Sequence, residues 1–114
     1  MKNIIKFLVI ILSICSITAA AEISKVRAKH ILVNSETEAV QLKRELNQGA
    51  DFSLLAMKYS LCPSGKNGGE LGYFERGQMV KEFENAAFSL SVGEISRPVQ
   101  TQFGWHLILL EDKQ

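Results

Sequence analysis

The sequence predicts an α+β fold, in which helices cover one small β-sheet, and three observations indicate it. Residues 26–33 alternate between two sets of side chains, as a strand does. Residues 35–59 contain two capped stretches with apolar residues at helical spacing. Residues 105–110 are apolar on both faces, which is typical of a buried central strand. The expected order of elements is therefore β-α-α-β-α-β-β.

The first strand, 26–33, places His30 on one face together with Ala28 and Leu32, because successive side chains of a strand point to opposite faces. A helix follows, since Ser35 and Glu38 are spaced as a capping box. Its inward stripe consists of Ala39, Leu42 and Leu46.

A second, shorter helix follows the first. Gly49 is placed to end the first helix, and Asp51 is placed to cap the second. The side chains expected to face inward are Phe52, Leu55, Ala56 and Tyr59.

A glycine-rich segment, residues 61–80, separates the two halves of the chain. It holds five of the eight glycines and also Cys62. Glycine reaches positive φ without steric cost, so the segment is expected to contain tight turns and close backbone approaches. Loops on a rigid scaffold often carry function. We therefore expect the functional site to be built around this segment.

The second half is expected to contain a short strand at 71–74, a helix at 80–88, a turn at 91–94, and strands at 95–101 and 105–110. The inward residues of the helix are Val80, Phe83, Ala86 and Ala87. Pro98 lacks an N–H group, which favours an edge position for the strand that holds it. The last strand presents His106, Ile108 and Leu110 on one face.

The N-terminal residues 1–21 match a secretory signal peptide. Lys2 and Lys6 precede an apolar run at 7–17, and small residues end at Ala21. An uncleaved membrane anchor is the alternative, although the apolar run is shorter than the roughly 20 residues that a spanning helix needs. The sequence therefore predicts one domain, residues 22–114, released by cleavage after Ala21.

Charge and cysteine content limit what residues 22–114 can do. The signal peptide holds two of the 13 basic residues and none of the 12 acidic ones, so its removal leaves a formal charge of −1. There is then no basic field for nucleic acid or an anionic membrane surface. Cleavage also removes Cys15 and leaves Cys62 as an unpaired thiol.

Three side chains could carry chemistry: His30, His106 and Cys62. If the first and last strands pair, the imidazoles can meet and a thiol from the overlying loop can reach them. A Cys–His nucleophile and a Cys/His₂ zinc site are alternatives, but no protease signature and no close ligand pair supports them. Each residue could also be an ordinary buried one.

Apolar residues flank the same segment. Met79 and Phe83 are four positions apart and lie on one helical face, and Phe103 precedes the strand of His106. They are either core residues or the lining of a small apolar pocket.

Four segments carry a distinctive combination of residues: Ala28-Lys29-His30-Ile31-Leu32-Val33, Gly49-Ala50-Asp51-Phe52, residues 60–79, and Thr101-Gln102-Phe103-Gly104-Trp105-His106. In order and spacing they resemble the parvulin peptidyl-prolyl isomerases across essentially all of residues 22–114. Single pieces are weak signals, whereas the combination is specific. The resemblance implies the parvulin (FKBP-like) fold, with a four-stranded antiparallel sheet surrounded by helices. It also implies isomerisation of X-Pro bonds without a cofactor or a metal.

The resemblance assigns roles to eight residues. Those implied in catalysis are His30, Cys62, Thr101 and His106. Those implied in binding the proline ring are Leu71, Met79, Phe83 and Phe103.

One branch of the parvulins selects phosphoserine or phosphothreonine before proline with a basic loop after the first strand. Here residues 34–38 hold Glu36 and Glu38 and no basic residue, so a phosphate would meet repulsion. The resemblance is therefore to the single-domain branch that does not select phosphate.

The sequence thus leads to an exported foldase, acting non-covalently on unfolded or proline-containing polypeptides. A chaperone-like binding module with the same fold and little catalysis is the alternative. We expect a monomer without stable membrane association after cleavage and without nucleic-acid partners. A periplasmic location is expected, with secretion or tethering by an uncleaved N-terminus as alternatives.

Overall fold

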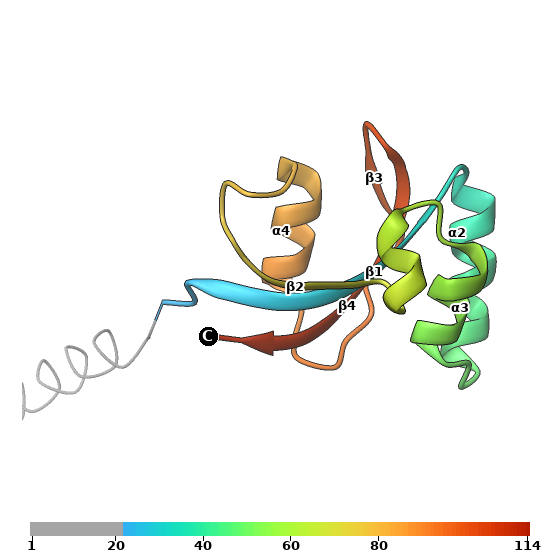
Figure 1. The fold of residues 1–114 in the computed structure, drawn as a ribbon, viewed down its shortest axis with the longest axis horizontal. Helices are drawn as coiled ribbons and strands as arrows, with labels where there is room; N and C mark the ends of the chain where they lie inside the picture. Colours follow the sequence, from blue (N-terminus) through green and yellow to red (C-terminus); the bar gives the residue numbers. More distant parts are fainter. Residues whose placement is uncertain (1–21) are drawn as a thin grey trace, which may run out of the picture.

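The structure, a computed structural model, describes residues 22–114 and has the predicted α+β architecture (Figure 1). Its elements are β1 (Lys25–Val33), α2 (Glu36–Asn47), α3 (Phe52–Tyr59), the 3₁₀ helix η1 (Pro63–Asn67), β2 (Glu70–Glu75), α4 (Lys81–Ser89), β3 (Val99–Thr101) and β4 (Gly104–Lys113). The predicted signal peptide, residues 1–21, lies outside the described residues. In residues 22–114 no helix is long and apolar enough to cross a membrane.

The four strands form one antiparallel sheet in the order β2-β1-β4-β3. The last strand is central, as predicted, and it pairs with the first strand, which was the condition for the two histidines to meet. In the β1–β4 register His30 lies opposite Ile108, and Leu32 lies opposite His106. Residues opposite each other share a face, so the two histidines occupy neighbouring positions on one face.

Each face of the sheet carries its own apolar cluster, and in Figure 1 helix α4 lies apart from the α2–α3 pair. The α4 face consists of Val26, Ala28, Phe74, Phe83, Ala87, Phe88, Leu90, Ile108 and Leu110. The α2–α3 face consists of Ile31, Val33, Ala39, Leu42, Leu46, Phe52, Leu55, Ala56 and Leu107. The histidines lie on the side of α4, as the strand alternation requires.

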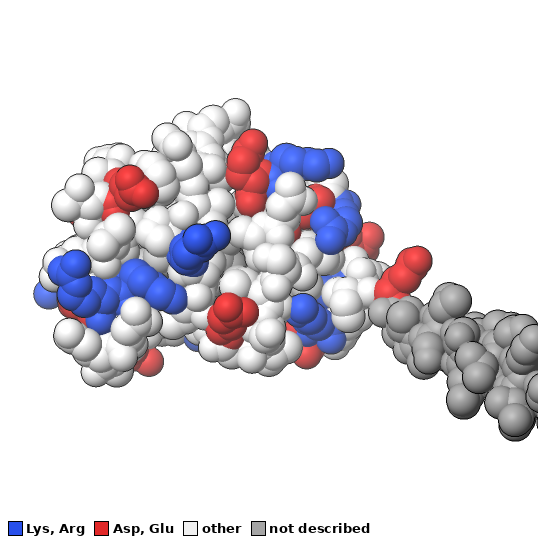
Figure 2. All heavy atoms as spheres, turned by 180° about the vertical axis from the view of Figure 1, so that it is seen from behind, with Lys and Arg blue, Asp and Glu red and all other residues white. Residues whose placement is uncertain are grey.

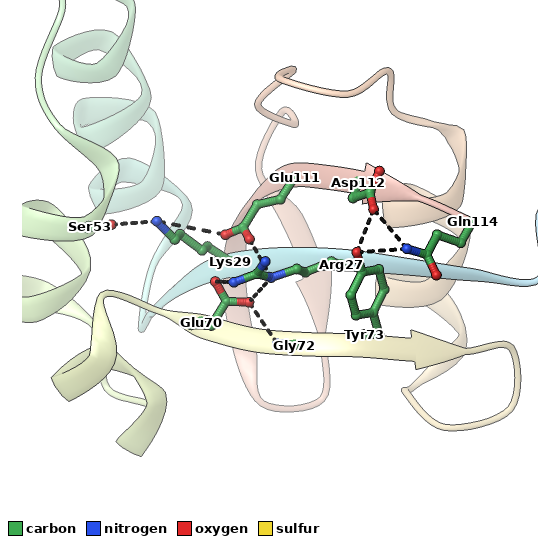
Figure 3. A network of polar contacts seen from close by, with 9 residues as sticks. All are labelled: Arg27, Lys29, Ser53, Glu70, Gly72, Tyr73, Glu111, Asp112 and Gln114. Atoms are coloured by element: carbon green, nitrogen blue, oxygen red, sulfur yellow. Dashed lines mark hydrogen bonds and ion pairs between the residues drawn. The ribbon is translucent and has the colours of Figure 1, made fainter.

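The rest of the α2–α3 face carries a polar network (Figure 3). Arg27 Nε lies 3.1 Å from Glu70 Oε1 and 2.9 Å from Glu111 Oε2. Lys29 Nζ donates a 2.8 Å hydrogen bond to Ser53 Oγ on α3. Charged side chains therefore cover the part of this face that the two helices leave open.

Both predicted helix caps are present. Ser35 Oγ accepts a hydrogen bond from Glu38 N–H at 3.2 Å, and Asp51 Oδ2 accepts one from Leu54 N–H at 2.9 Å. These bonds satisfy donors that the first helical turn leaves free.

Three details differ from the prediction. The predicted strand 95–101 is regular only over Val99–Thr101, because Ser96 Oγ accepts the Ile108 N–H and Pro98 has no N–H to donate. Tyr59, expected to face inward, is exposed at the end of α3. Val80 precedes α4 as its N-cap instead of forming its first turn.

Candidate functional site

An apolar cavity of about 510 Å³ opens between the sheet, α4 and the glycine-rich segment. Its lining consists of His30, Leu32, Leu61, Cys62, Pro63, Leu71, Gln78, Met79, Val80, Phe83, Phe103 and His106. Seven of the eight residues singled out in the sequence are in this set, and the eighth, Thr101, contacts His106 from behind. The cavity thus brings together side chains that are up to 76 positions apart.

The glycine-rich segment is fixed to β1 by backbone hydrogen bonds at His30 and at Leu32. Leu61 N–H donates to Leu32 O at 2.8 Å, and His30 N–H donates to Gly69 O at 2.9 Å. Ser60 Oγ accepts from Leu32 N–H at 3.1 Å and from Cys62 N–H at 3.3 Å. These bonds hold Cys62 at the edge of the cavity.

Gly69 is required by a close backbone approach. Its φ is +86°, and a Cβ atom there would overlap the carbonyl oxygen of His30. Only glycine combines that conformation with that proximity. The predicted close approach is therefore found at the strand position that carries His30.

The two histidines and Thr101 form one hydrogen-bonded chain. His30 Nδ1 and His106 Nδ1 are 3.0 Å apart, and Thr101 Oγ1 is 2.7 Å from His106 Nε2. Phe103 N–H donates to Thr101 Oγ1 at 3.1 Å. All three side chains are buried.

The direction of donation follows from counting hydrogens. Thr101 has one hydroxyl hydrogen, and His106 Nε2 is its partner in the structure. If Thr101 donates there, His106 carries its proton on Nδ1 and donates to His30 Nδ1. His30 then carries its proton on Nε2, the atom that has no hydrogen-bond partner among the described residues. In this arrangement the Thr101 hydroxyl and the His106 N–H each donate a hydrogen bond, and only the His30 Nε2–H has no acceptor among the described residues.

Both histidines favour the neutral form. Burial lowers the pKa of His106 to about 4, and burial together with the nearby His106 lowers the pKa of His30 to about 4. Desolvation penalises a charged imidazole, and a second charge beside it adds repulsion. At neutral pH the cavity therefore contains an uncharged imidazole pair.

Phe83 joins the histidines to the apolar wall. Its ring meets His30 edge to face, with centroids 5.4 Å apart, and meets His106 with centroids 5.2 Å apart. It is buried, and Phe74 lies behind it at 6.0 Å between centroids. Phe103, in contrast, is mostly exposed and borders the cavity mouth.

Five lining residues were not singled out in the sequence: Leu32, Leu61, Pro63, Gln78 and Val80. Leu32 shares the strand face of His30, and that alternation was a usable signal. Gln78 turns its side chain to the backbone, since Oε1 accepts from Glu75 N–H at 2.7 Å. This contact depends on loop geometry that no spacing rule reveals.

Within residues 22–114 no group of three or more His, Cys, Asp and Glu side chains is arranged to hold a metal ion.

Comparisons with known proteins show the family of this chain. The family model described as rotamase, PPIC-type PPIase domain, matches residues 19–112. The foldase protein PrsA of Geobacillus kaustophilus is 54% identical over 91 residues, which cover 79% of this chain and 32% of that protein. A parvulin-like PPIase of Rickettsia bellii is 50% identical over 94 residues, which cover 79% of this chain and 33% of that protein. The chain thus spans about a third of the length of these curated relatives.

Solved structures give the same fold. A crystal structure of the peptidylprolyl isomerase PrsA from Bacillus anthracis superposes with a TM-score of 0.79 at 45% identity, covering 81% of this chain and 43% of that one. The solution structure of NmPin, the parvuline of Nitrosopumilus maritimus, superposes with a TM-score of 0.73 at 42% identity, covering 81% of this chain and 100% of that one. The chain therefore belongs to the parvulin family of PPIC-type peptidyl-prolyl isomerase domains.

Proposed function

We propose that residues 22–114 accelerate cis-trans isomerisation of X-Pro bonds in exported polypeptides, without a cofactor and without a covalent intermediate. The observation that carries this proposal is the apolar cavity of about 510 Å³ with an uncharged histidine pair in its wall. Uncatalysed isomerisation takes tens to hundreds of seconds, long enough to limit the folding of other chains.

The reaction requires a twisted amide and breaks no bond. Conjugation of the planar amide creates a barrier of roughly 18–20 kcal/mol, and the conjugated form is charge-separated. Twisting removes that charge separation, so an apolar, water-poor site favours the twisted amide over both planar forms. Catalysis follows when the site binds that state more tightly than either planar state.

We assign different parts of the substrate to different lining residues. We assign the proline ring to Leu71, Met79, Phe83 and Phe103, which supply apolar contact. The polar side of the cavity faces the carbonyl that swings during rotation. In the tautomer derived above, His30 Nε2–H is a buried donor with no hydrogen-bond partner among the described residues, and Cys62 also lines the cavity. Thr101 acts through His106 and is a positioning residue.

Selection of a phosphorylated residue before proline does not fit this site. None of the described residues that line the cavity is Lys or Arg. The segment after β1 leads into α2 with Glu36 and Glu38 in the first helical turn. On the face shown in Figure 2, acidic and basic side chains are interspersed. An uncharged residue before proline is therefore the preferred substrate.

We further propose export, with cleavage of the signal peptide after Ala21, a periplasmic location and a monomeric mature chain. Mass spectrometry of the full-length protein, expressed in a bacterium and recovered from its cell envelope, tests cleavage. A first residue of Glu22 supports it, and a retained N-terminus supports the tethered alternative.

The isomerase proposal is tested with the chain 22–114 on X-Pro tetrapeptides in a protease-coupled assay. Residues 22–114 contain all four strands of the sheet, and the match to NmPin covers the whole of that chain. Leucine, alanine, glutamate and phosphoserine are compared as X. Acceleration that is greatest for uncharged X and least for phosphoserine supports the proposal, and no acceleration for any X contradicts it.

The Met79→Ala and Phe83→Ala variants separate the enzyme from the binding module. Loss of isomerisation with client binding retained supports the enzyme. The binding module is favoured over the isomerase if the parent protein shows no isomerisation and both variants protect an aggregating client as well as the parent does.

A further inference from the structure

Helix α3 presents a row of exposed apolar side chains, which we call the α3 shelf: Leu54, Met57 and Leu61. They are 63%, 57% and 56% exposed. Their spacing of three and four places Leu54 and Met57 on one face of α3 and Leu61 just beyond its end. Single exposed apolar residues are ordinary, whereas a contiguous group indicates an interaction surface.

The shelf is continuous with the cavity of the proposed site. A second hollow of about 330 Å³ is lined by Met57, Ser60, Leu61, Cys62, Pro63, Gly65 and Lys66. Leu61, Cys62 and Pro63 also line the first cavity. Because these three residues line both hollows, the two hollows adjoin, and a chain that passes from the first into the second reaches Met57.

The distances suit an extended peptide. From Leu54 to the end of α3 at Tyr59 the helix rises roughly 7–8 Å, at about 1.5 Å per residue. An extended chain advances roughly 3.3–3.6 Å per residue, so two or three residues span this length. Two or three residues of an extended client chain can therefore cover the helical part of the shelf.

The charge around the shelf selects the chemistry of its occupant. The lining of the second hollow contains Lys66 and no Asp or Glu, whereas at the other end of the shelf Asp51 Oδ2 accepts the Leu54 N–H. Lys66 lines the second hollow, and Lys58 Nζ lies 5.2 Å from the centre of the Tyr59 ring. At the Met57–Leu61 end of the shelf, an apolar side chain flanked by an acidic one therefore matches this surface, and a basic flank meets repulsion.

We propose that the α3 shelf binds the same client polypeptide that places its proline in the cavity. The client class is an unfolded chain with a large apolar residue two to four positions from the proline and an acidic residue beyond it. This inference rests on the proposed isomerase function and adds a substrate preference to it. Such apolar residues are buried in folded proteins, so the shelf favours clients that have not yet folded.

The test compares two substrates on the Leu54→Ser/Met57→Ser double variant of chain 22–114. The first is an X-Pro tetrapeptide, which is too short to reach the shelf. The second is a 12-residue peptide with a leucine three positions from the proline and an aspartate beyond the leucine. Two versions are made, one with the leucine and aspartate before the proline and one with both after it. Val92→Ser is the matched control, since Val92 is 58% exposed in a turn outside the shelf.

The double variant is expected to leave kcat/KM for the tetrapeptide unchanged. For the 12-residue peptide that the parent protein turns over more efficiently, kcat/KM is expected to fall on the order of tenfold. Val92→Ser is expected to change neither. Replacing the aspartate of that peptide by lysine is expected to lower its kcat/KM with the parent protein. An equal loss on tetrapeptide and long peptide, or no loss on either long peptide, overturns the proposal.

Two further outcomes separate this inference from its alternatives. If light scattering shows a parent dimer that the double variant makes monomeric, the shelf is an interface between copies and the proposal is overturned. If the parent protein isomerises no tetrapeptide, the isomerase proposal fails. In that case binding of a fluorescent 12-residue peptide still tests the shelf, and equal affinity for parent and double variant overturns it.

Discussion

Glu84 accepts a 2.6 Å hydrogen bond from the backbone N–H of Gly77 through Oε1, and its Oε2 lies 3.1 Å from Arg76 Nη1. The carboxylate is buried on α4, next to Phe83. It thereby holds the loop that delivers Gln78 and Met79 to the cavity. The bond from Gly77 and the charge of Arg76 lower the pKa of the Glu84 carboxyl.

Replacing Glu84 by glutamine should loosen this loop, because an amide has one acceptor oxygen for two donors and places an NH₂ group against one of them. We expect KM for X-Pro tetrapeptides to rise severalfold with a smaller change in kcat, since Met79 contributes binding. Glu82→Gln, an exposed change on the same helix, is the control. A lower melting temperature with unchanged KM would show that Glu84 only stabilises the fold.

The same carboxylate should have a pH signature. Its pKa is lowered from 4.5 in the folded protein, so its stabilisation is present above pH 4.5 and is lost as pH falls through the folded value. The difference in urea midpoint between the parent protein and Glu84→Gln should therefore shrink below pH 4.5. A difference that stays constant from pH 7 to 3 contradicts this assignment.

The central strands could be predicted because their signals are local. In residues 26–33 and 105–110 the alternation of side chains shows which residues share a face. Apolar residues on both faces of 105–110 also indicate its central position. The meeting of His30 and His106 follows once those strands pair. The resemblance to parvulins added Thr101, whose contact with His106 spans only five residues.

Other features depend on contacts that no sequence spacing encodes. Glu84 was not among the residues predicted to face inward on its helix, and it is buried with its carboxylate bonded to the loop at Gly77. Ile95 reaches β4 only through an isolated bridge to Leu109, because Ser96 and Pro98 interrupt the ladder around it. Tyr59 fits the apolar stripe of α3, yet that helix is short and its last turn extends past the core.

Thr101→Val tests the hydrogen-bonded chain, because valine keeps the shape of threonine and removes its hydroxyl. Phe103 N–H and His106 Nε2 then lose their partner. A buried polar group left unpaired costs roughly 1–3 kcal/mol, so urea unfolding should show a loss of that size. Isomerase kcat should fall, and Thr101→Ser should restore most of it. Ring ¹⁵N shifts of His106 that do not change in Thr101→Val would contradict a role in fixing the tautomer.

The lowered histidine pKa values predict acid sensitivity within a defined window. Both fall from 6.5 to about 4, so between these values the unfolded chain binds more protons than the folded one. Stability therefore rises with pH across this window and is lost as the pH falls from 6.5 toward 4. Urea midpoints at pH 7, 6 and 5 should decline, and less steeply in a His30→Asn/His106→Asn variant. Imidazole resonances that titrate near 6.5 in the folded protein would contradict the prediction.

Gly69 and Gly72 form a matched pair for testing the close approach at His30. Both have positive φ, at +86° and +72°, but only at Gly69 would a Cβ atom overlap His30 O, whereas nothing lies within 4 Å at Gly72. Gly72→Ala should therefore cost roughly 1–2 kcal/mol, the penalty of a left-handed residue with a Cβ. Gly69→Ala should cost more, because β1 must move away.

The displacement of β1 should also reach the site, since Gly69 O accepts the His30 N–H. Tetrapeptide kcat/KM should therefore fall in Gly69→Ala and stay near the parent value in Gly72→Ala. Urea unfolding of both variants measures stability, and ring ¹⁵N shifts of His30 report the geometry of the imidazole pair. If the two variants are equally stable and equally active, the close approach of Gly69 to His30 O does not position His30 in the cavity, and the prediction is wrong.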